Sequence, residues 1–249
     1  MMRFSPYHDV APTLKVSMPA RILAIFAIPA IAVFLSFLLL GFAWWPLALL
    51  SLPAAALTVW YFWYRSGEAI IRSLDARSLG QNEGQRIRNT VETLCLTSGI
   101  DQPELWVIDT DACNLISLSG RTNALIATTG LLNELNVIEM EGVVAHGLLK
   151  MSTGAVTYDA LAASAHPFIT GAQHEMARRW GTGDAGVIAF DISGVGLTRY
   201  PPGLRSALER IDGRSTEIPG ADSLGSALLI PPAAQRVPLD HRIEVLWEL

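Results

Sequence analysis

A long charge-free stretch near the amino end constrains this chain more than any other feature. No Asp, Glu, Lys or Arg occurs from Ile22 to Tyr64. The stretch is about twice as long as the roughly 20 apolar residues that a helix needs to cross the hydrocarbon core of a membrane. Residues 41–46 interrupt it with Gly, Pro and two adjacent Trp, which suit a turn at the headgroup level. Residues 22–64 are therefore predicted to form a transmembrane hairpin of two helices.

Basic residues beside this stretch set its expected orientation. They flank both ends, and the turn between the two spans carries none. Since cytoplasmic flanks are enriched in Lys and Arg, both ends of the hairpin, with the N-terminal segment 1–21, are expected in the cytoplasm, as in a multi-pass plasma-membrane protein. A cleaved signal peptide is the alternative for the first span, although its apolar run exceeds the usual length of about 7 to 15 residues. The flanking residues are Arg3, Lys15, Arg21, Arg65, Arg72 and Arg77.

Composition narrows the expected partners. The chain has 249 residues, of which 51% are hydrophobic and 16% are charged, and its net charge is −5. Because this charge is modest and no basic stripe is present, nucleic acid is not expected as a partner. The two cysteines, Cys95 and Cys113, are spaced for neither a disulfide framework nor a C-x-x-C metal motif. The lipid bilayer is the partner that the hydrophobic content favours.

The chain after the hairpin has a mixed composition, and residues 67–249 are enough for one domain with its own core. Residues 83–98 have a helical period that Gly99 ends. Two short apolar runs, 104–109 and 123–128, predict strands of a small sheet, with a loop or hairpin region between them. This part of the domain is therefore expected to mix helix and strand.

Helices are expected to dominate the rest of the domain. Asn136, followed by Glu139, predicts a capping box at the start of a helix. A buried helix is expected over residues 187–197, and the Pro-Pro pair at 201–202 begins another. Residues 214–226 are rich in Gly, Ser and Asp and predict a surface loop. The sequence thus predicts a mainly helical α+β domain after the hairpin.

The helix that follows Asn136 carries the pentapeptide His146-Gly147-Leu148-Leu149-Lys150. In the related motif H-E-x-x-H, two imidazoles one turn apart bind zinc and the Glu is the general base. The pentapeptide alone carries no signal. Its context, TTGLLNELNVIEMEGVVAHGLLKM, resembles the active-site helix of the HtpX-like membrane zinc metallopeptidases, the family that includes the CAAX prenyl endopeptidases.

The resemblance covers about Leu74 to Leu249, with the blocks in the same order. Upstream, ELWVID, Asn114 and NALIATTG resemble the family's strand, its Asn-Ala loop and the strand that edges the substrate cleft. Downstream, FDISGVGLTRYPPGLRSALERI resembles the segment of the third zinc ligand, and IPPAAQRVPLDHRIEVLWEL resembles the C-terminal block. The resemblance implies a zincin-like fold of the gluzincin type, in a bacterial inner membrane.

Carried over position by position, the resemblance leaves an incomplete zinc site. His146 keeps the first ligand, whereas Gly147 stands at the catalytic Glu and Lys150 at the second His. Val187 stands at the third ligand, and Asp191, four residues later, is retained. One imidazole is far from the three protein ligands of a catalytic zinc site, and an ammonium repels a dication. No catalytic residue, metal or cofactor is therefore expected; zinc would be the cofactor if the family activity were retained.

With these losses, the resemblance predicts a membrane-anchored pseudopeptidase that acts as a binding, regulatory or scaffold module. The expected peptide-binding cleft comprises Asn114, Asn123, Ala124, Leu125 and Ile126, where an extended peptide would add as a strand. The expected partners are membrane or cytosolic proteins or peptides, including an active paralogue. The alternative is a zinc metalloendopeptidase involved in membrane-protein proteolysis.

Two local hypotheses concern the charged residues. Lys150 either pairs with Asp191 in place of the metal, or it points to solvent and leaves His146 as a buried, hydrogen-bonded histidine. Residues 174–178, HEMAR, resemble a second zinc motif in which Arg replaces the second His. A solvated helix face is the alternative for that segment.

Overall fold

The structure is a computed structural model that describes residues 67–80, 84–120, 123–153, 184–232 and 237–249, with Val156 and a few single positions between 31 and 65. The predicted hairpin lies almost entirely outside the described residues, and segment 1–21 and the HEMAR segment lie wholly outside them. Within the described part, no helix is both long and apolar enough to cross a membrane.

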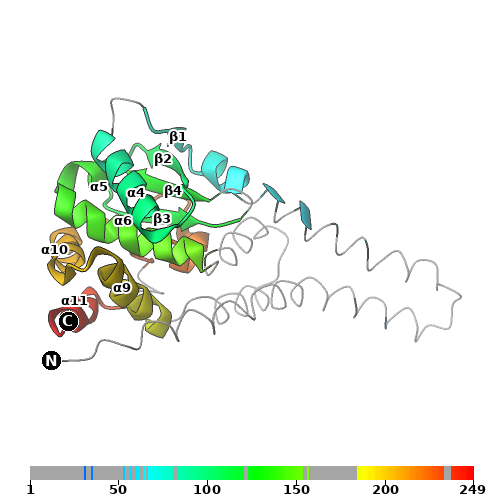
Figure 1. Ribbon diagram of the computed structural model, residues 1–249. Coiled ribbons are helices and arrows are strands. Elements are labelled where there is room, and N and C mark those ends of the chain that lie inside the picture. The colour runs from blue at the N-terminus through cyan, green and yellow to red at the C-terminus, as the bar shows by residue number, and fades with distance from the viewer. Residues whose placement is uncertain are drawn as a thin grey trace, which may run out of the picture.

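One small sheet has the strand order β1-β2-β4-β3 (Figure 1). β1 (Arg77–Ser78) pairs antiparallel with β2 (Glu104–Ile108), and β2 pairs parallel with β4 (Ala124–Thr128). β3 (Leu115–Leu118) pairs antiparallel with β4 at the opposite edge. Both strands predicted from apolar runs are confirmed, and β3 lies in the stretch where a loop or hairpin was expected.

β4 is an inner strand of the sheet. β2 pairs with one side of β4 and β3 pairs with the other. All five residues of β4 are buried. An added peptide strand needs an unpaired edge, so the backbone of β4 is closed to one. The outer strand on this side of the sheet is β3.

Helices make up most of the described domain, which is therefore mixed α/β with a small sheet, as the sequence predicts. Figure 1 shows α6 between the sheet and the group formed by α9, α10 and α11. The bounds are α4 (Gln85–Ser98), α5 (Thr129–Glu134), α6 (Val137–Ser152), α9 (Asp184–Thr198), α10 (Pro201–Ile211) and α11 (Leu239–Trp247), with a 3₁₀ segment η2 (Asp222–Ala227) before α11.

The predicted helix over 83–98 is confirmed as α4. Ile87, Val91 and Leu94 recur on one face and are buried, because a period near 3.6 brings them to the same side of the helix. The helix ends at Gly99, whose φ of 68° is left-handed and favours glycine. This helix packs against α6 and so supports the central helix of the domain.

α6 begins with the predicted capping box. The Asn136 side chain accepts a hydrogen bond from the Glu139 backbone, and the Glu139 carboxylate accepts one from the Asn136 backbone. The same carboxylate accepts hydrogen bonds from Ser206 at 2.7 Å and Arg210 at 3.0 Å. Burial raises the pKa of Glu139, but the hydrogen bonds from Ser206, Asn136 and Arg210 more than offset it and hold that pKa below its usual value. Glu139 thus ties the start of α6 to α10.

A close approach of two backbones also joins α6 to α10. A Cβ atom on Gly142 would lie 2.5 Å from the backbone nitrogen of Leu204 and 2.7 Å from its Cα. Only glycine lets the two helices approach so closely at this point. The position and tilt of α6 are therefore fixed at its first two turns.

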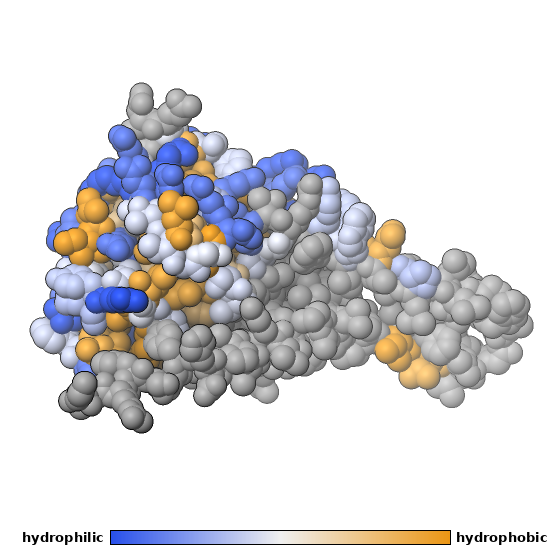
Figure 2. All heavy atoms as spheres, in the orientation of Figure 1, coloured by the Kyte–Doolittle hydropathy of each residue, from blue (hydrophilic) through white to orange (hydrophobic). Residues whose placement is uncertain are grey.

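The surface of the described domain mixes hydrophilic and hydrophobic side chains (Figure 2). Its exposed large apolar residues include Leu96, Val137, Ile138, Tyr200 and Trp247. The guanidinium of Arg205 lies 3.7 Å from the centroid of the Trp247 ring. Isolated exposed apolar side chains are ordinary on protein surfaces, so these residues do not by themselves mark a site.

Candidate functional site

α6 places the three motif positions in the interior of the domain. His146 and Lys150 are each only 1% exposed, and Gly147 is buried. The helix packs against α4, α9, α10 and β3, so its apolar residues are covered on several sides. The predicted site residues on α6 and α9 are therefore brought together in the core.

His146 lies against Asp191 of α9. The ring atom Nδ1 is 2.8 Å from the carboxylate atom Oδ1. This contact is close but poorly aligned, and neither ring nitrogen makes a well-formed hydrogen bond to the described residues. Burial lowers the pKa of His146 to about 4, and the nearby Asp191 only partly offsets that effect. The imidazole is therefore neutral at pH 7, with a buried Nε2 that lacks a partner among the described atoms.

Asp191 is held mainly by Arg242 of α11. The guanidinium atoms Nε and Nη2 each donate to a different carboxylate oxygen at 2.7 Å, and both side chains are 1% exposed. Burial raises the pKa of Asp191, but the charge of Arg242, the close contact with His146 and the hydrogen bonds from Arg242 hold that pKa well below its usual value. Asp191 is thus a buried carboxylate whose charge is balanced by an arginine.

Gly147, at the position of the family's catalytic Glu, faces the sheet. A Cβ atom there would lie 3.0 Å from side-chain atoms of Leu115, Ser117 and Leu125. These residues belong to β3 and β4, so the sheet packs directly on the helix at this point. The space next to Gly147 is filled by side chains.

The Lys150 side chain adopts neither of the two arrangements predicted for it. Its side chain is buried, so the ammonium does not point to solvent. It donates to the backbone carbonyl of Leu228 at 2.9 Å. Among the described residues, the ion pairs of Asp191 are those with His146 and Arg242, and none joins it to Lys150. The pairing hypothesis for Lys150 is therefore wrong, and Arg242 takes the position next to the carboxylate.

Val187, at the position of the third zinc ligand, is 3% exposed and has no donor atom for a metal. It lies on α9 one turn before Asp191. Phe190 on the same helix is buried, and its ring lies at 75° to the His146 ring, with the two centroids 6.3 Å apart. The backbones of α9 and α6 approach closely here, since a Cβ on Gly194 would lie 3.1 Å from the backbone nitrogen of His146. The surroundings of His146 on α9 are thus apolar apart from Asp191.

The residues at the family's zinc positions do not fit a zinc ion. His146 offers one imidazole, Val187 offers nothing and Lys150 brings a positive charge, whereas catalytic zinc takes three protein ligands. Arg242 adds a second buried cation. In the described part of the chain, no group of three or more His, Cys, Asp or Glu side chains could hold a metal ion.

The residues predicted to line a peptide cleft are mostly buried. Asn114, Ala124, Leu125 and Ile126 are at most 1% exposed, and Asn123 is partly buried. The amide nitrogen of Asn114 donates to the carbonyls of Thr216 and Ile230, each at 2.8 Å. The structure thus brings Asn114 against this chain's own backbone. A role of the five residues in binding a foreign peptide stays a prediction.

Two parts of this site are not predicted from the sequence. Arg242 lies in the C-terminal block, and a basic residue on the apolar side of a short helix is a signal that a carboxylate lies opposite. The segment Leu228–Ile230 contributes through its backbone. Since backbone carbonyls are the same in every residue, the side-chain pattern could not have identified it.

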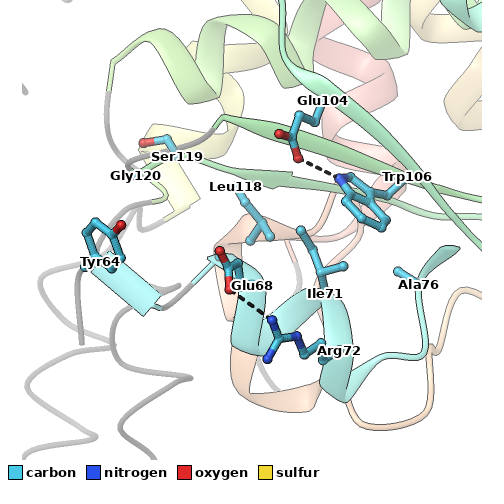
Figure 3. Close-up of a pocket in the computed structure, with 11 residues that line it drawn as sticks. Tyr64, Glu68, Ile71, Arg72, Ala76, Glu104, Trp106, Leu118, Ser119 and Gly120 are labelled. Atoms are coloured by element: carbon cyan, nitrogen blue, oxygen red, sulfur yellow. Dashed lines mark hydrogen bonds and ion pairs between the residues drawn. The ribbon is translucent and has the colours of Figure 1, made fainter. Parts of the chain in front are cut away.

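A separate cavity of about 340 Å³ lies between residues 64–76 and the sheet (Figure 3). Ile71, Leu118 and Trp106 form part of its wall. Two polar contacts border it, from Arg72 to Glu68 at 3.1 Å and from Trp106 to Glu104 at 3.1 Å. None of the motif positions lines this cavity, so it is distinct from the site around His146. The full lining is Tyr64, Gly67, Glu68, Ile71, Arg72, Ala76, Glu104, Trp106, Leu118, Ser119 and Gly120.

No family model matches the chain, and no solved structure matches it. Curated proteins named protease HtpX homolog do match. The one from Tropheryma whipplei is 38% identical over 103 residues, which are 40% of this chain and 34% of that protein. The one from Bacteroides fragilis is 33% identical over 94 residues, or 36% of this chain and 29% of that protein. The one from Dictyoglomus turgidum is 25% identical over 209 residues, 70% of this chain and 69% of that protein.

The first two matches span about a third of each relative's length, and the third extends the similarity to most of this chain. All three relatives carry the same protein name. These similarities, at 25–38% identity over part to most of the chain, support the assignment of the chain to the HtpX-like protease family.

Proposed function

We propose that this chain is a membrane-anchored pseudopeptidase, a non-catalytic family member with a zincin-like fold of the gluzincin type that acts as a binding, regulatory or scaffold module. Its proposed location is the plasma membrane, through the charge-free stretch 22–64. Its proposed partners are membrane or cytosolic proteins, including an active paralogue.

The observation that carries this proposal is the packing at Gly147. The family mechanism needs a carboxylate here to activate water, and this chain has no side chain at that position. β3 and β4 fill the adjoining space with Leu115, Ser117 and Leu125. A longer side chain at this position would have to displace them. The position of the general base therefore lacks the chemical group and is closely packed against the sheet.

The charges around His146 support the same conclusion. Lys150 and Arg242 are buried cations, and the charge of each contributes to lowering the pKa of His146. Zinc at this point would meet one imidazole and two positive side chains, which is an unfavourable environment for a dication. The donor set of this chain is consistent with a site that works without metal.

A zinc metalloendopeptidase is the second candidate, and two observations favour it. The matched relatives are named proteases. His146 also keeps a buried ring nitrogen without a partner among the described atoms, on an imidazole whose other nitrogen lies next to a carboxylate. That arrangement is common for metal-ligating histidines.

Hydrolysis of casein by the full chain in detergent distinguishes the two candidates. The assay compares the protein with added zinc, with a chelator, and as the variant His146→Ala. The proposal predicts no cleavage above a buffer control under all three conditions. Cleavage that zinc supports, and that both the chelator and His146→Ala abolish, would establish the metalloendopeptidase instead.

A further inference from the structure

The outer edge of β3 is covered by another segment of the same chain. Ile116 forms an antiparallel bridge with Leu228. The Leu229 backbone nitrogen donates to the Leu115 carbonyl at 2.7 Å. Residues 228–230 therefore lie against β3 at Leu115 and Ile116, through one isolated bridge and one backbone hydrogen bond, at the edge where an extended peptide would otherwise add.

Three buried side chains hold the three consecutive carbonyls of this segment. Lys150 donates to Leu228 at 2.9 Å, Arg242 donates to Leu229 at 2.9 Å, and Asn114 donates to Ile230 at 2.8 Å. The Asn114 side-chain oxygen also accepts from the Ile230 backbone nitrogen at 3.1 Å. These side chains come from α6, from α11 and from the start of β3.

The three side chains are among the most buried polar groups of the described domain. Lys150 and Arg242 are 1% exposed, and Asn114 is 0% exposed. A lysine is seldom buried without polar partners, and the Leu228 carbonyl is one partner of Lys150. Lys150 stands where the resembled family has its second zinc-binding imidazole. At this position the chain has exchanged a metal ligand for a donor to its own backbone.

We infer that the strand-binding edge of β3 is occupied by this chain's own segment Leu228–Ile230, and that Lys150 is the positioning residue that latches it there. Extended peptides are thereby excluded from the edge next to the former zinc site. The inference deepens the proposed non-catalytic role, because it gives the lysine that replaced a ligand a function of its own. It directs the search for protein partners to other surfaces.

Amide hydrogen exchange followed by mass spectrometry tests the latch in the full chain in detergent. In the wild type, a peptic fragment covering residues 224–232 is expected to be protected, because the amides of Leu228, Leu229 and Ile230 all donate hydrogen bonds. In Lys150→Met, which keeps a long unbranched side chain, exchange of this fragment should rise about 10- to 100-fold. That factor corresponds to losing one hydrogen bond from a charged donor.

The global stability of the same variant separates a latch from general packing. The Leu228 carbonyl loses a hydrogen bond, which costs about 1–3 kcal/mol. If that cost falls on the segment it holds, exchange at 224–232 should rise more than exchange in α4 and β4, which open with the whole domain. An equal rise in all three regions would indicate general packing and would overturn the inference.

Arg86→Met is the matched control. Arg86 is also a cation that donates to backbone carbonyls, those of Leu132 and Leu135, at 2.6 and 3.1 Å. Its loss should speed exchange near residues 132–136 and leave the fragment 224–232 unchanged. The latch is refuted if wild-type residues 228–230 exchange as an open loop, a result that does not depend on any variant folding. It is also refuted if Lys150→Met leaves that fragment unchanged. Neither result bears on zinc binding or hydrolysis, which test the proposed function. The two proposals can therefore be refuted independently.

Discussion

Arg242 binds Asp191 through two parallel hydrogen bonds, each 2.7 Å long, in the interior of the domain. The pair joins α11 to α9, and Nη1 of the same arginine reaches the Leu229 carbonyl at 2.9 Å. One side chain thus fixes the C-terminal helix, the helix that carries the third-ligand position, and the segment along β3. Because both charges are buried, removing one partner is expected to lower the free energy of unfolding strongly.

The first prediction concerns this pair. Arg242→Leu should lower the free energy of unfolding by about 3–5 kcal/mol, because it leaves the Asp191 charge buried without its main partner. Chemical unfolding in detergent measures the change. The exposed pair of Arg72 and Glu68 is the control, since Arg72→Leu should cost only about 0–1 kcal/mol. Equal losses in the two variants would contradict the role assigned to Arg242.

The second prediction compares two glycines of α6. Gly142→Ala should lower the free energy of unfolding by about 2 kcal/mol or more, because the new Cβ would meet the Leu204 backbone at 2.5 Å and backbone cannot yield cheaply. Gly147→Ala meets only side-chain ends at 3.0 Å, and the helix propensity of Ala offsets part of that cost by about 1 kcal/mol. Thermal unfolding of both variants should therefore rank Gly142→Ala as clearly less stable. The reverse order would contradict the close contact between the backbones of α6 and α10 at Gly142.

The third prediction is a pH dependence at Glu139. Its pKa is lower in the folded than in the unfolded chain, so its contribution is present above the unfolded value of 4.5 and is lost as the pH falls through the folded value. Glu139→Gln should be less stable than the wild type by about 1–3 kcal/mol at pH 7. The difference should shrink as the pH falls below 4.5, in unfolding curves recorded at several pH values.

Glu141→Gln on the same helix is the control for that experiment and should lie within about 0.5 kcal/mol of the wild type. The contrary result is a difference in unfolding free energy between Glu139→Gln and wild type that stays constant from pH 7 to well below pH 4.5. It would show that the charge of the carboxylate does not join α6 to α10.

The fourth prediction concerns Asn114, whose side-chain amide donates twice and accepts twice. Asn114→Asp has the same shape but places a carboxylate against the carbonyls of Thr216 and Ile230. The free energy of unfolding should fall by about 3 kcal/mol or more, because both donors are lost and a charge is buried. Asn123→Asp, at a partly buried position before β4, should cost less than about 1 kcal/mol in the same assay. Similar losses in both variants would contradict the clamp on Ile230.

Much of the fold could be predicted because its signals are local. The period of Ile87, Val91 and Leu94 predicts α4, and the pair Asn136 and Glu139 predicts the start of α6. Strand order is different, since it depends on pairing between distant residues. The apolar runs do not specify the order β1-β2-β4-β3, in which β3 is the outer strand next to β4.

The chemistry of the site was only partly accessible from the sequence. The identities of Gly147, Lys150 and Val187 are enough to predict that a zinc site is incomplete. The fate of the Lys150 ammonium was not predictable, because its acceptor is a backbone carbonyl 78 residues away in the chain. Arg242 was missed for a similar reason, since its partner lies 51 residues away, on another helix.

Zinc content by mass spectrometry tests the central claim most directly. The full chain is purified in detergent without chelator, incubated with one equivalent of zinc, desalted and compared with His146→Ala treated in the same way. The account predicts substoichiometric zinc that is equal in both proteins. One tightly bound zinc per wild-type chain that is lost in His146→Ala would contradict it, because His146 would then belong to a working metal site.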